Sequence, residues 1–132
     1  MCGVIGIMGN TDVAQEIYDG LLTIQHRGQD ATGMCTYDGG QFHLKKGLGQ
    51  VRNVFRTKNM MRLLGNIGLG HVRYPTVGAI GHEECQPFIL NIPFGLALVH
   101  NGNLINAQQL KKELTEKDFR HVNSTSDGEV IL

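Results

Sequence analysis

The sequence predicts an α+β domain that combines short strands with amphipathic helices. Three observations support this prediction. Glycine accounts for 18 of the 132 residues, about twice its average usage, and it separates apolar runs of strand length. Two of these runs flank Asp38-Gly39-Gly40, a turn-forming sequence that favours an antiparallel hairpin. Other segments repeat apolar residues at helical spacing.

The first half of the chain contains a predicted strand, a helix and a hairpin. Residues 4–8 are apolar and are expected to form a short buried strand. Asp12 and Gln15 fit a capping box that would open the following helix. The apolar face of this helix would consist of Val13, Ile17, Leu21 and Ile24. The predicted elements that follow are hairpin strands at 33–37 and 42–44 and a short helix at 58–64.

The second half contains two further predicted strands and two helix starts. Residues 67–72 and 96–99 are apolar and strand-like, and 74–87 connects them as a long loop. Loops of this length are usually functional or disordered. One helix would open at Asn106 and Gln109 and turn Leu110 and Leu114 inward, and a second would open at a capping box of Ser126 and Glu129. That second apolar face stops after residues 130–132, so we expect residues 1–132 to be a truncated domain.

Composition excludes several functional classes. Twelve basic and twelve acidic residues give a formal net charge of zero, which argues against a nucleic-acid partner or a polybasic membrane surface. Three cysteines cannot form a closed set of disulfides, which favours a reducing compartment. The sequence shows no secretory signal and no apolar run of membrane-spanning length. We therefore expect a soluble, cytoplasmic protein.

Cys2 is the most informative residue of the chain. Removal of Met1 would leave a thiol and a free α-amine on the same residue. A thiol reacts as its thiolate, and an α-amine titrates near pH 8, which suits a general base. One residue could then supply both nucleophile and base. The alternative is that Cys2 is a small core residue at the start of the first strand.

Three further segments supply groups that would complement such a nucleophile. Arg73 stands where a predicted strand enters the long loop, and arginine forms a planar fork suited to a carboxylate. Asn101 and Gly102 follow another strand, where an amide side chain and a backbone N–H could form an oxyanion hole. Asp127 lies at a predicted helix start and could hold an ammonium group.

Each of these residues also has a simpler interpretation. Arg73 could be an ordinary surface arginine, Asn101-Gly102 an ordinary turn, and Asp127 a carboxylate that stabilises a helix N-terminus. Taken together, a thiol, an anion-binding arginine, an oxyanion hole and a cation-binding aspartate would suit an α-amino acid with an attackable side-chain carbonyl. Glutamine is such a substrate.

Ordered motifs along the whole chain resemble the glutaminase domain of class II glutamine amidotransferases, which are N-terminal nucleophile hydrolases. The matching blocks are Cys2-Gly3-Val4-Ile5-Gly6, Gln25-His26-Arg27-Gly28-Gln29-Asp30-Ala31-Thr32-Gly33, Gly70-His71-Val72-Arg73-Tyr74-Pro75-Thr76, His100-Asn101-Gly102-Asn103-Leu104 and Thr125-Ser126-Asp127. Within this class, His26, Gln29 and Tyr74 favour the branch that uses phosphoribosyl pyrophosphate over the glucosamine-6-phosphate synthase branch, which typically has Tyr, Tyr and Trp there.

The resemblance implies a role for each matching residue. Cys2 would attack the glutamine amide and form a γ-glutamyl thioester, with its own α-amine moving the proton. Asn101 and Gly102 would stabilise the oxyanion. Arg73 would bind the α-carboxylate and Asp127 the α-ammonium of L-glutamine, and Thr76 would add a contact from the loop. Water would then release glutamate, and the ammonia would pass to a synthase domain.

The resemblance also implies an architecture and a set of partners. The family fold is a four-layer sandwich of two antiparallel sheets between helical layers, of which 1–132 would be the N-terminal portion. The synthase partner, a phosphoribosyltransferase domain absent from this chain, would use magnesium to make 5-phosphoribosylamine for purine biosynthesis. The glutaminase domain itself would need no cofactor, and the full-length enzyme, a glycosyltransferase, would be a homo-oligomer. A catalytically silent fragment is the alternative.

A structural metal site is not favoured. His82 and Cys85 have ligand spacing, but they form only half of a tetrahedral ligand set, and no second pair has such spacing. Cys35 falls within a predicted strand and is expected to be a core residue. We therefore predict no metal site in this chain.

Overall fold

The computed structural model describes residues 1–74 and 81–132. Its main feature is a four-stranded antiparallel sheet with strand order β1-β4-β2-β3. The strands in this order are β1 (Gly3–Met8), β4 (Ile67–Arg73), β2 (Ala31–Tyr37) and β3 (Phe42–Leu48). Because β4 pairs with both β1 and β2, the end of β4 lies beside the start of both strands.

Helix α1 (Ala14–Thr23) covers one face of this sheet and forms the core with it. Ile17 and Leu21 are fully buried. A Cβ at Gly70 of β4 would lie 2.7 Å from Ile17 Cγ2 and 3.0 Å from Leu21 Cδ1, so glycine at this position allows the helix to approach the strand closely. The shorter elements on this side are η1 (Gln25–Arg27), α2 (Val51–Val54) and α3 (Thr57–Met60).

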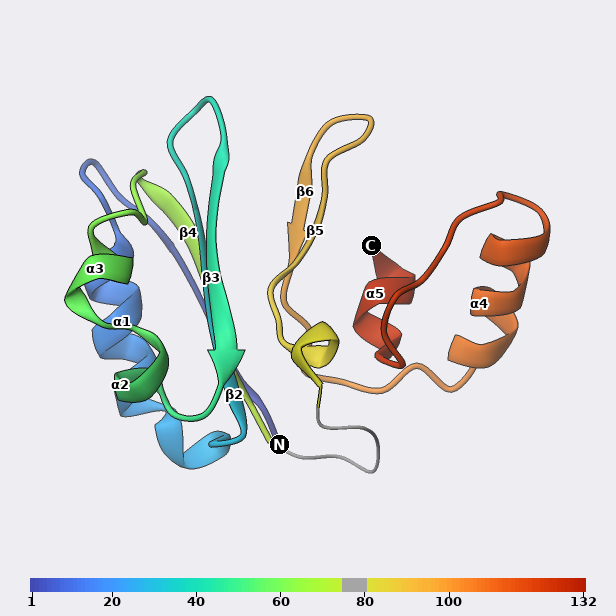
Figure 1. Cartoon of the computed structure of the whole chain (residues 1–132), viewed down its shortest axis with the longest axis horizontal. Coiled ribbons are helices and arrows are strands. Elements are labelled where there is room, and N and C mark those ends of the chain that lie inside the picture. Colours follow the sequence, from blue (N-terminus) through green and yellow to red (C-terminus); the bar gives the residue numbers. More distant parts are fainter. Residues whose placement is uncertain (75–80) are drawn as a thin grey trace.

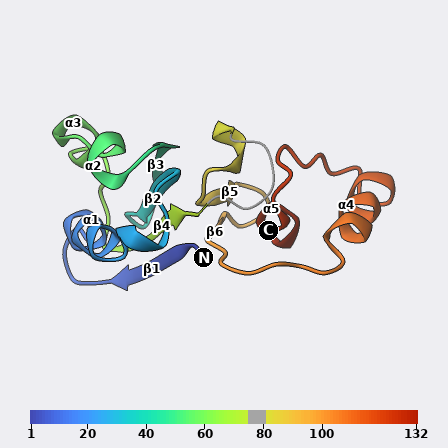
Figure 2. The same cartoon turned by 90° about the horizontal axis from the view of Figure 1, so that it is seen from below.

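A second, smaller sheet and two helices form the other side of the molecule. Strands β5 (Phe88–Leu90) and β6 (Leu96–Leu98) pair antiparallel after the 3-10 helix η2 (His82–Glu84). Helices α4 (Ala107–Glu116) and α5 (Asp127–Ile131) follow. Figure 1 and the view from below in Figure 2 show four layers: α1–α3, the large sheet, the β5–β6 hairpin, and α5 with α4. This agrees with the predicted sandwich.

The segment after η2 is fixed onto the large sheet by two contacts: the backbone of Gln86 lies close to Gly33, and the Lys46 ammonium binds two carbonyl oxygens. A Cβ at Gly33 of β2 would overlap the carbonyl group of Gln86, so only glycine permits this contact. The Lys46 ammonium on β3 donates hydrogen bonds to the carbonyl oxygens of Cys85 at 2.6 Å and Pro87 at 3.2 Å. These contacts join the two sheets.

The predicted hairpin is confirmed, and both of its strands are longer than expected. The strands predicted at 67–72 and 96–99 are confirmed within one residue of their ends. The short helix predicted at 58–64 is wrong in extent, because α3 ends at Met60 and Met61 and Arg62 form a turn. Strand β5 and helix α2 were not predicted, since runs of three and four residues carry little periodicity.

The prediction that the first strand is buried is only half right. Exposure alternates along β1, with Val4 45% and Met8 79% exposed. Strand β1 is an edge strand, and Ile5 and Ile7 on one of its faces pack against the core. Apolar residues therefore lie on both the buried and the exposed face of β1, so the sequence lacks the alternation of apolar and polar residues that would have revealed the exposed face.

The capping box predicted at Asp12 and Gln15 is wrong. Helix α1 begins at Ala14, and its N-cap residue Val13 makes no side-chain cap hydrogen bond. The Asp12 carboxylate instead accepts a hydrogen bond from the backbone N–H of Gly65 at 2.7 Å. The Asp12 carboxylate therefore binds the turn before β4 instead of capping the helix as the local sequence had predicted.

Within 1–74 and 81–132, no helix is long and apolar enough to cross a membrane.

We predict that Ile17→Ala lowers the free energy of unfolding by about 2–5 kcal/mol, because it leaves a cavity between α1 and β4. Ile105→Ala removes the same atoms from a side chain that is 99% exposed, and we expect a change within about 0.5 kcal/mol. Urea unfolding followed by circular dichroism measures both. Equal losses in the two variants would contradict this description of the core.

Candidate active site

Strand pairing places Cys2 beside the end of β4. Gly3 pairs with Val72, so Cys2 lies just beyond the last pair, next to the residues that leave β4. The Tyr74 backbone N–H donates to Cys2 Sγ at 3.4 Å, and Arg27 Nε donates to the Cys2 carbonyl oxygen at 3.0 Å. The thiol is partly exposed, so a small molecule can reach it.

The other two thiols are poor nucleophiles. Cys35 and Cys85 are buried, and burial raises the pKa of Cys35 to about 11 and also raises the pKa of Cys85. Because the thiolate is the reactive species, both are protonated at neutral pH. Cys35 is 2% exposed, which confirms the prediction that it is a core residue.

Arg73 is a buried arginine, not the surface residue of the alternative interpretation. It is 9% exposed at the end of β4. Its carbonyl oxygen accepts a hydrogen bond from the Asp30 N–H at 3.2 Å, and a Cβ at Gly28 would lie 2.4 Å from its carbonyl carbon. Its nearest carboxylate oxygen is Glu84 Oε2, 4.0 Å from Nη2. The backbone of Arg73 is therefore fixed by residues 28–30.

The turn that contains Asn101 and Gly102 is held at both of its ends. The His100 N–H donates to the Gln86 side-chain oxygen at 2.6 Å, and the Leu104 N–H donates to Asp127 Oδ2 at 2.6 Å. Asn101 and Gly102 themselves are exposed. The segment that follows β6 lies at the same end of the sheets as the amino terminus (Figure 1).

Asp127 is brought to this turn by α5. Its Oδ2 accepts from Leu104 and lies 3.5 Å from His100 Nε2. A carboxylate has about four acceptor positions, so the contacts at Oδ2 leave acceptor capacity for a cation. Asp127 is the first residue of α5, and its negative charge also suits a helix N-terminus, as the simpler interpretation expected.

The capping box predicted at Ser126 and Glu129 forms only on one side. Ser126 is the N-cap of α5 and accepts from the Gly128 N–H at 3.2 Å. Glu129 instead accepts from the Asn123 and Ser124 N–H groups at 2.9 and 2.7 Å. These hydrogen bonds lower the pKa of Glu129 although its burial acts in the opposite direction. The glutamate therefore ties down the segment before the helix.

The structure thus brings most of the predicted residues to one end of the two sheets. Cys2 and Arg73 are linked through Tyr74, and the Asn101-Gly102 turn is linked to Asp127. Thr76 lies outside the described residues. Three residues that support the site were missed: Arg27, Glu84 and Gln86. Arg27 lies in a quoted motif, but Glu84 and Gln86 carried no sequence signal, because polar residues in a loop are usually exposed.

His71 is a second buried titratable residue beside the site. It is fully buried on β4, and neither ring nitrogen has a hydrogen-bond partner among the described residues. Burial lowers its pKa to about 4, a nearby backbone group of His100 partly opposes this, and the positive charge of Arg73 adds to it. The imidazole is therefore neutral at pH 7.

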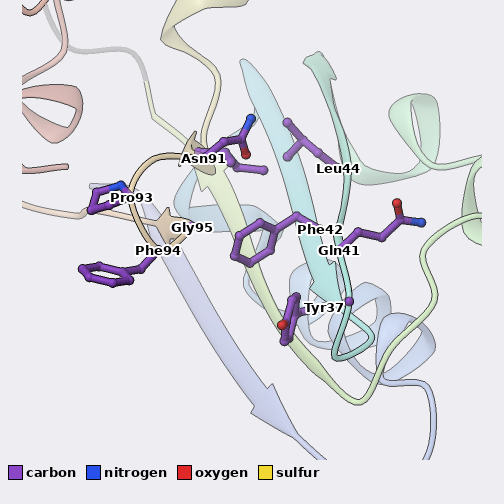
Figure 3. A pocket seen from close by; sticks show the side chains of 10 residues that line it. Tyr37, Gln41, Phe42, Leu44, Asn91, Pro93, Phe94 and Gly95 are labelled. Carbon is purple, nitrogen blue, oxygen red and sulfur yellow. The ribbon is translucent and has the colours of Figure 1, made fainter.

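A large hollow among the described residues lies away from these groups. It has a volume of about 900 Å³ and lies between the β2–β3 turn and the β5–β6 turn (Figure 3). Its lining residues are Tyr37, Gly40, Gln41, Phe42, Leu44, Ile89, Asn91, Pro93, Phe94 and Gly95. None of the predicted site residues is among them. No group of three or more metal-ligating side chains occurs within 1–74 and 81–132.

Comparison with known proteins identifies the family. The profile of the glutamine amidotransferase domain matches residues 56–132. The chain therefore belongs to the glutamine amidotransferase domain family.

Relatives named amidophosphoribosyltransferase are similar over the whole chain. The protein from Pseudomonas aeruginosa is 52% identical over 132 residues, and that from Escherichia coli is 53% identical over 133. Each alignment covers all of this chain and 26% of the relative, so the chain spans about a quarter of the length of these proteins.

Two solved structures share the fold. One is the glutamine phosphoribosylpyrophosphate amidotransferase from B. subtilis complexed with ADP and GMP, with a TM-score of 0.87 and 38% identity. The other, described as the allosteric regulatory enzyme of purine biosynthesis, has a TM-score of 0.89 and 39% identity. Both matches cover 99% of this chain and 28% of the other. The predicted N-terminal nucleophile hydrolase fold, with two antiparallel sheets between helical layers, is confirmed.

We predict that burial of neutral His71 makes the fold less stable in acid. The unfolded residue titrates near pH 6.5 and the folded residue near pH 4. Between these values the unfolded state binds more protons, so stability falls as the pH falls. The expected loss from this residue between pH 7 and pH 4 is roughly 3 kcal/mol.

Urea unfolding at several pH values checks this prediction in wild type, His71→Asn and His121→Asn. His121 is exposed, so its variant should follow the wild-type pH dependence, whereas His71→Asn should show a shallower slope below pH 6.5. An unchanged slope in His71→Asn would contradict the assignment.

Proposed function

We propose that this chain hydrolyses L-glutamine to glutamate and ammonia with Cys2 as the nucleophile. The observation that carries the proposal is the contact between Cys2 and the end of β4. The thiol accepts a hydrogen bond from Tyr74 N–H at 3.4 Å, directly after the buried cation of Arg73. A partly exposed thiol, hydrogen-bonded to the residue that follows a buried arginine, suits an amino acid substrate.

Binding would place the α-amino acid end of glutamine between Arg73 and Asp127. The Arg73 guanidinium would pair with the α-carboxylate, and the Asp127 carboxylate with the α-ammonium. The anchored backbone of Arg73 supports this role, because it restricts where the side chain can lie, and a planar guanidinium loses little freedom for each hydrogen bond that it forms. Thr76 remains a predicted contact. The side-chain amide of glutamine would then point toward Cys2.

The chemistry would proceed by acyl transfer. The Cys2 sulfur forms a bond to the amide carbon, and the carbonyl oxygen becomes an oxyanion that Asn101 Nδ2 and the Gly102 N–H stabilise. The α-amine of Cys2 takes the thiol proton as the sulfur attacks and then delivers that proton to the amide nitrogen, so that the C–N bond breaks and ammonia leaves. Water then attacks the γ-glutamyl thioester and releases glutamate. The thiol, the α-amine and the hydrogen-bond donors to the oxyanion perform all of these steps, so we propose that no cofactor takes part.

Removal of Met1 is a condition of this mechanism. While Met1 is attached, the nitrogen of Cys2 is an amide and cannot act as a base. Met1 is 79% exposed, which leaves the bond between Met1 and Cys2 accessible for processing.

We propose further that the ammonia is used by a phosphoribosyltransferase synthase domain of the full-length protein, where 5-phosphoribosylamine would be made for purine biosynthesis. The names of the relatives support this branch over a glucosamine-6-phosphate synthase. Three free cysteines support a reducing, cytoplasmic location. The use of magnesium by the synthase domain and a homo-oligomeric state stay predictions.

We predict that a glutamine analogue carrying an electrophilic ketone labels Cys2 selectively in the protein that begins at Cys2. Arg73→Lys should slow this labelling by about 10- to 100-fold, because the bidentate carboxylate contact is lost. Arg52→Lys, at an exposed position, should label like wild type. Mass spectrometry measures the rates, and iodoacetamide reports the general reactivity of the thiol. A wild-type protein that labels no faster than free cysteine would instead support a catalytically silent chain.

We also predict that glutaminase activity depends on the amino terminus. Protein that retains Met1 should release ammonia on the order of 100-fold more slowly than protein beginning at Cys2, since a positioned base contributes about 10²–10⁴-fold. Intact mass and amino-terminal sequencing establish the two forms, and glutamate release measures their activity. Equal activity would show that another group acts as the base.

A further inference from the structure

Glu84 is a buried carboxylate that sequence analysis did not single out. It lies at the end of η2 and is 3% exposed. A buried charge is costly unless it is paired or hydrogen-bonded, and its two oxygens face different parts of the site. Oε1 accepts from the Thr125 N–H at 2.6 Å and from the Thr125 hydroxyl at 2.7 Å. Oε2 lies 4.0 Å from Arg73 Nη2.

The contact to Arg73 balances its charge without occupying its donors. Charge-assisted hydrogen bonds between guanidinium and carboxylate are about 2.7–2.9 Å long, so a separation of 4.0 Å is an ion pair and not a hydrogen bond. The guanidinium carries five N–H donors. Glu84 can therefore balance the charge of the cation without using these donors, which a second carboxylate could then engage.

The contact to Thr125 fixes the approach to Asp127. Thr125 directly precedes Ser126, the N-cap of α5, and Asp127 is the first residue of that helix. Two hydrogen bonds from one residue, one from its backbone and one from its side chain, restrict both the path of the chain and the side-chain rotamer. The carboxylate of Glu84 thus links the residue before α5 to the end of β4.

We propose that Glu84 is a positioning residue that sets the spacing between Arg73 and Asp127 for the α-amino acid end of the substrate. This inference rests on the proposed glutamine hydrolysis and adds a residue to it. A merely structural glutamate would affect the whole site or only stability. A positioning glutamate affects recognition of the α-carboxylate and α-ammonium and leaves the thiol itself unchanged.

Labelling of Cys2 separates these roles in the protein that begins at Cys2. Glu84→Gln keeps an oxygen acceptor for Thr125 but removes the charge that faces Arg73. We expect labelling by the ketone analogue of glutamine to slow about 10- to 100-fold, while labelling by iodoacetamide changes less than about twofold. In glutaminase assays the loss should appear mainly in KM. Glu83→Gln changes an exposed neighbour and should behave like wild type.

Thr125→Val gives an independent test. It keeps the branched shape and the backbone N–H but removes the hydroxyl donor, and we expect a smaller loss of selectivity in the same direction. If Glu84→Gln does not fold, as judged by circular dichroism, Thr125→Val decides alone.

The outcomes distinguish the two proposals. Wild type without selective labelling contradicts the glutaminase function itself. A selective wild type with an equally selective, folded Glu84→Gln contradicts only the role of Glu84, as does an equal loss of reactivity toward both reagents. Should Thr125→Val have to decide alone, unchanged selectivity in that variant also contradicts the role of Glu84.

Discussion

The antiparallel register between β1 and β4 is the constraint on which the rest of the site depends. A shift of one residue would turn every side chain of β1 to the opposite face and move Cys2 away from Tyr74. Crowding opposes such a shift, because any residue with a side chain that replaced Gly3 opposite Val72 would clash: a Cβ there would lie 2.8 Å from Val72 Cγ2. The position of Cys2 is therefore decided by the packing of the strand end directly beside it.

A second constraint is the segment 84–87, which connects the large sheet to the Asn101 turn and to α5. Lys46 fixes this segment to β3 through two carbonyl oxygens. Its side chains then reach in two directions: Glu84 contacts Arg73 and Thr125, and Gln86 holds the His100 N–H. The large sheet, the Asn101 turn and α5 thus share one support. A substitution in this segment would therefore alter the contacts of all three.

Sequence reasoning succeeded where structure is local and periodic. Helical spacing predicted α1, and the turn at residues 38–40 predicted the β2–β3 hairpin. It failed where distant residues compete for the same group: Asp12 binds Gly65 instead of capping α1, and Glu129 binds residues before its helix. The predicted site residues came from ordered motifs. The burial of Glu84 could not be predicted, because it depends on a partner 41 residues away in the chain.

The buried charge of Arg73 is the strongest physical argument for a binding role. Burying a guanidinium removes it from water, and the cost is recovered only with close hydrogen-bonded partners. Among the described residues, Arg73 has its nearest carboxylate oxygen at 4.0 Å, which is too far for a hydrogen bond. A residue kept only for stability would favour a closer pair or an apolar side chain. Among the described residues the Arg73 guanidinium has no hydrogen-bonded carboxylate, and this supports our proposal that it pairs with the α-carboxylate of the substrate.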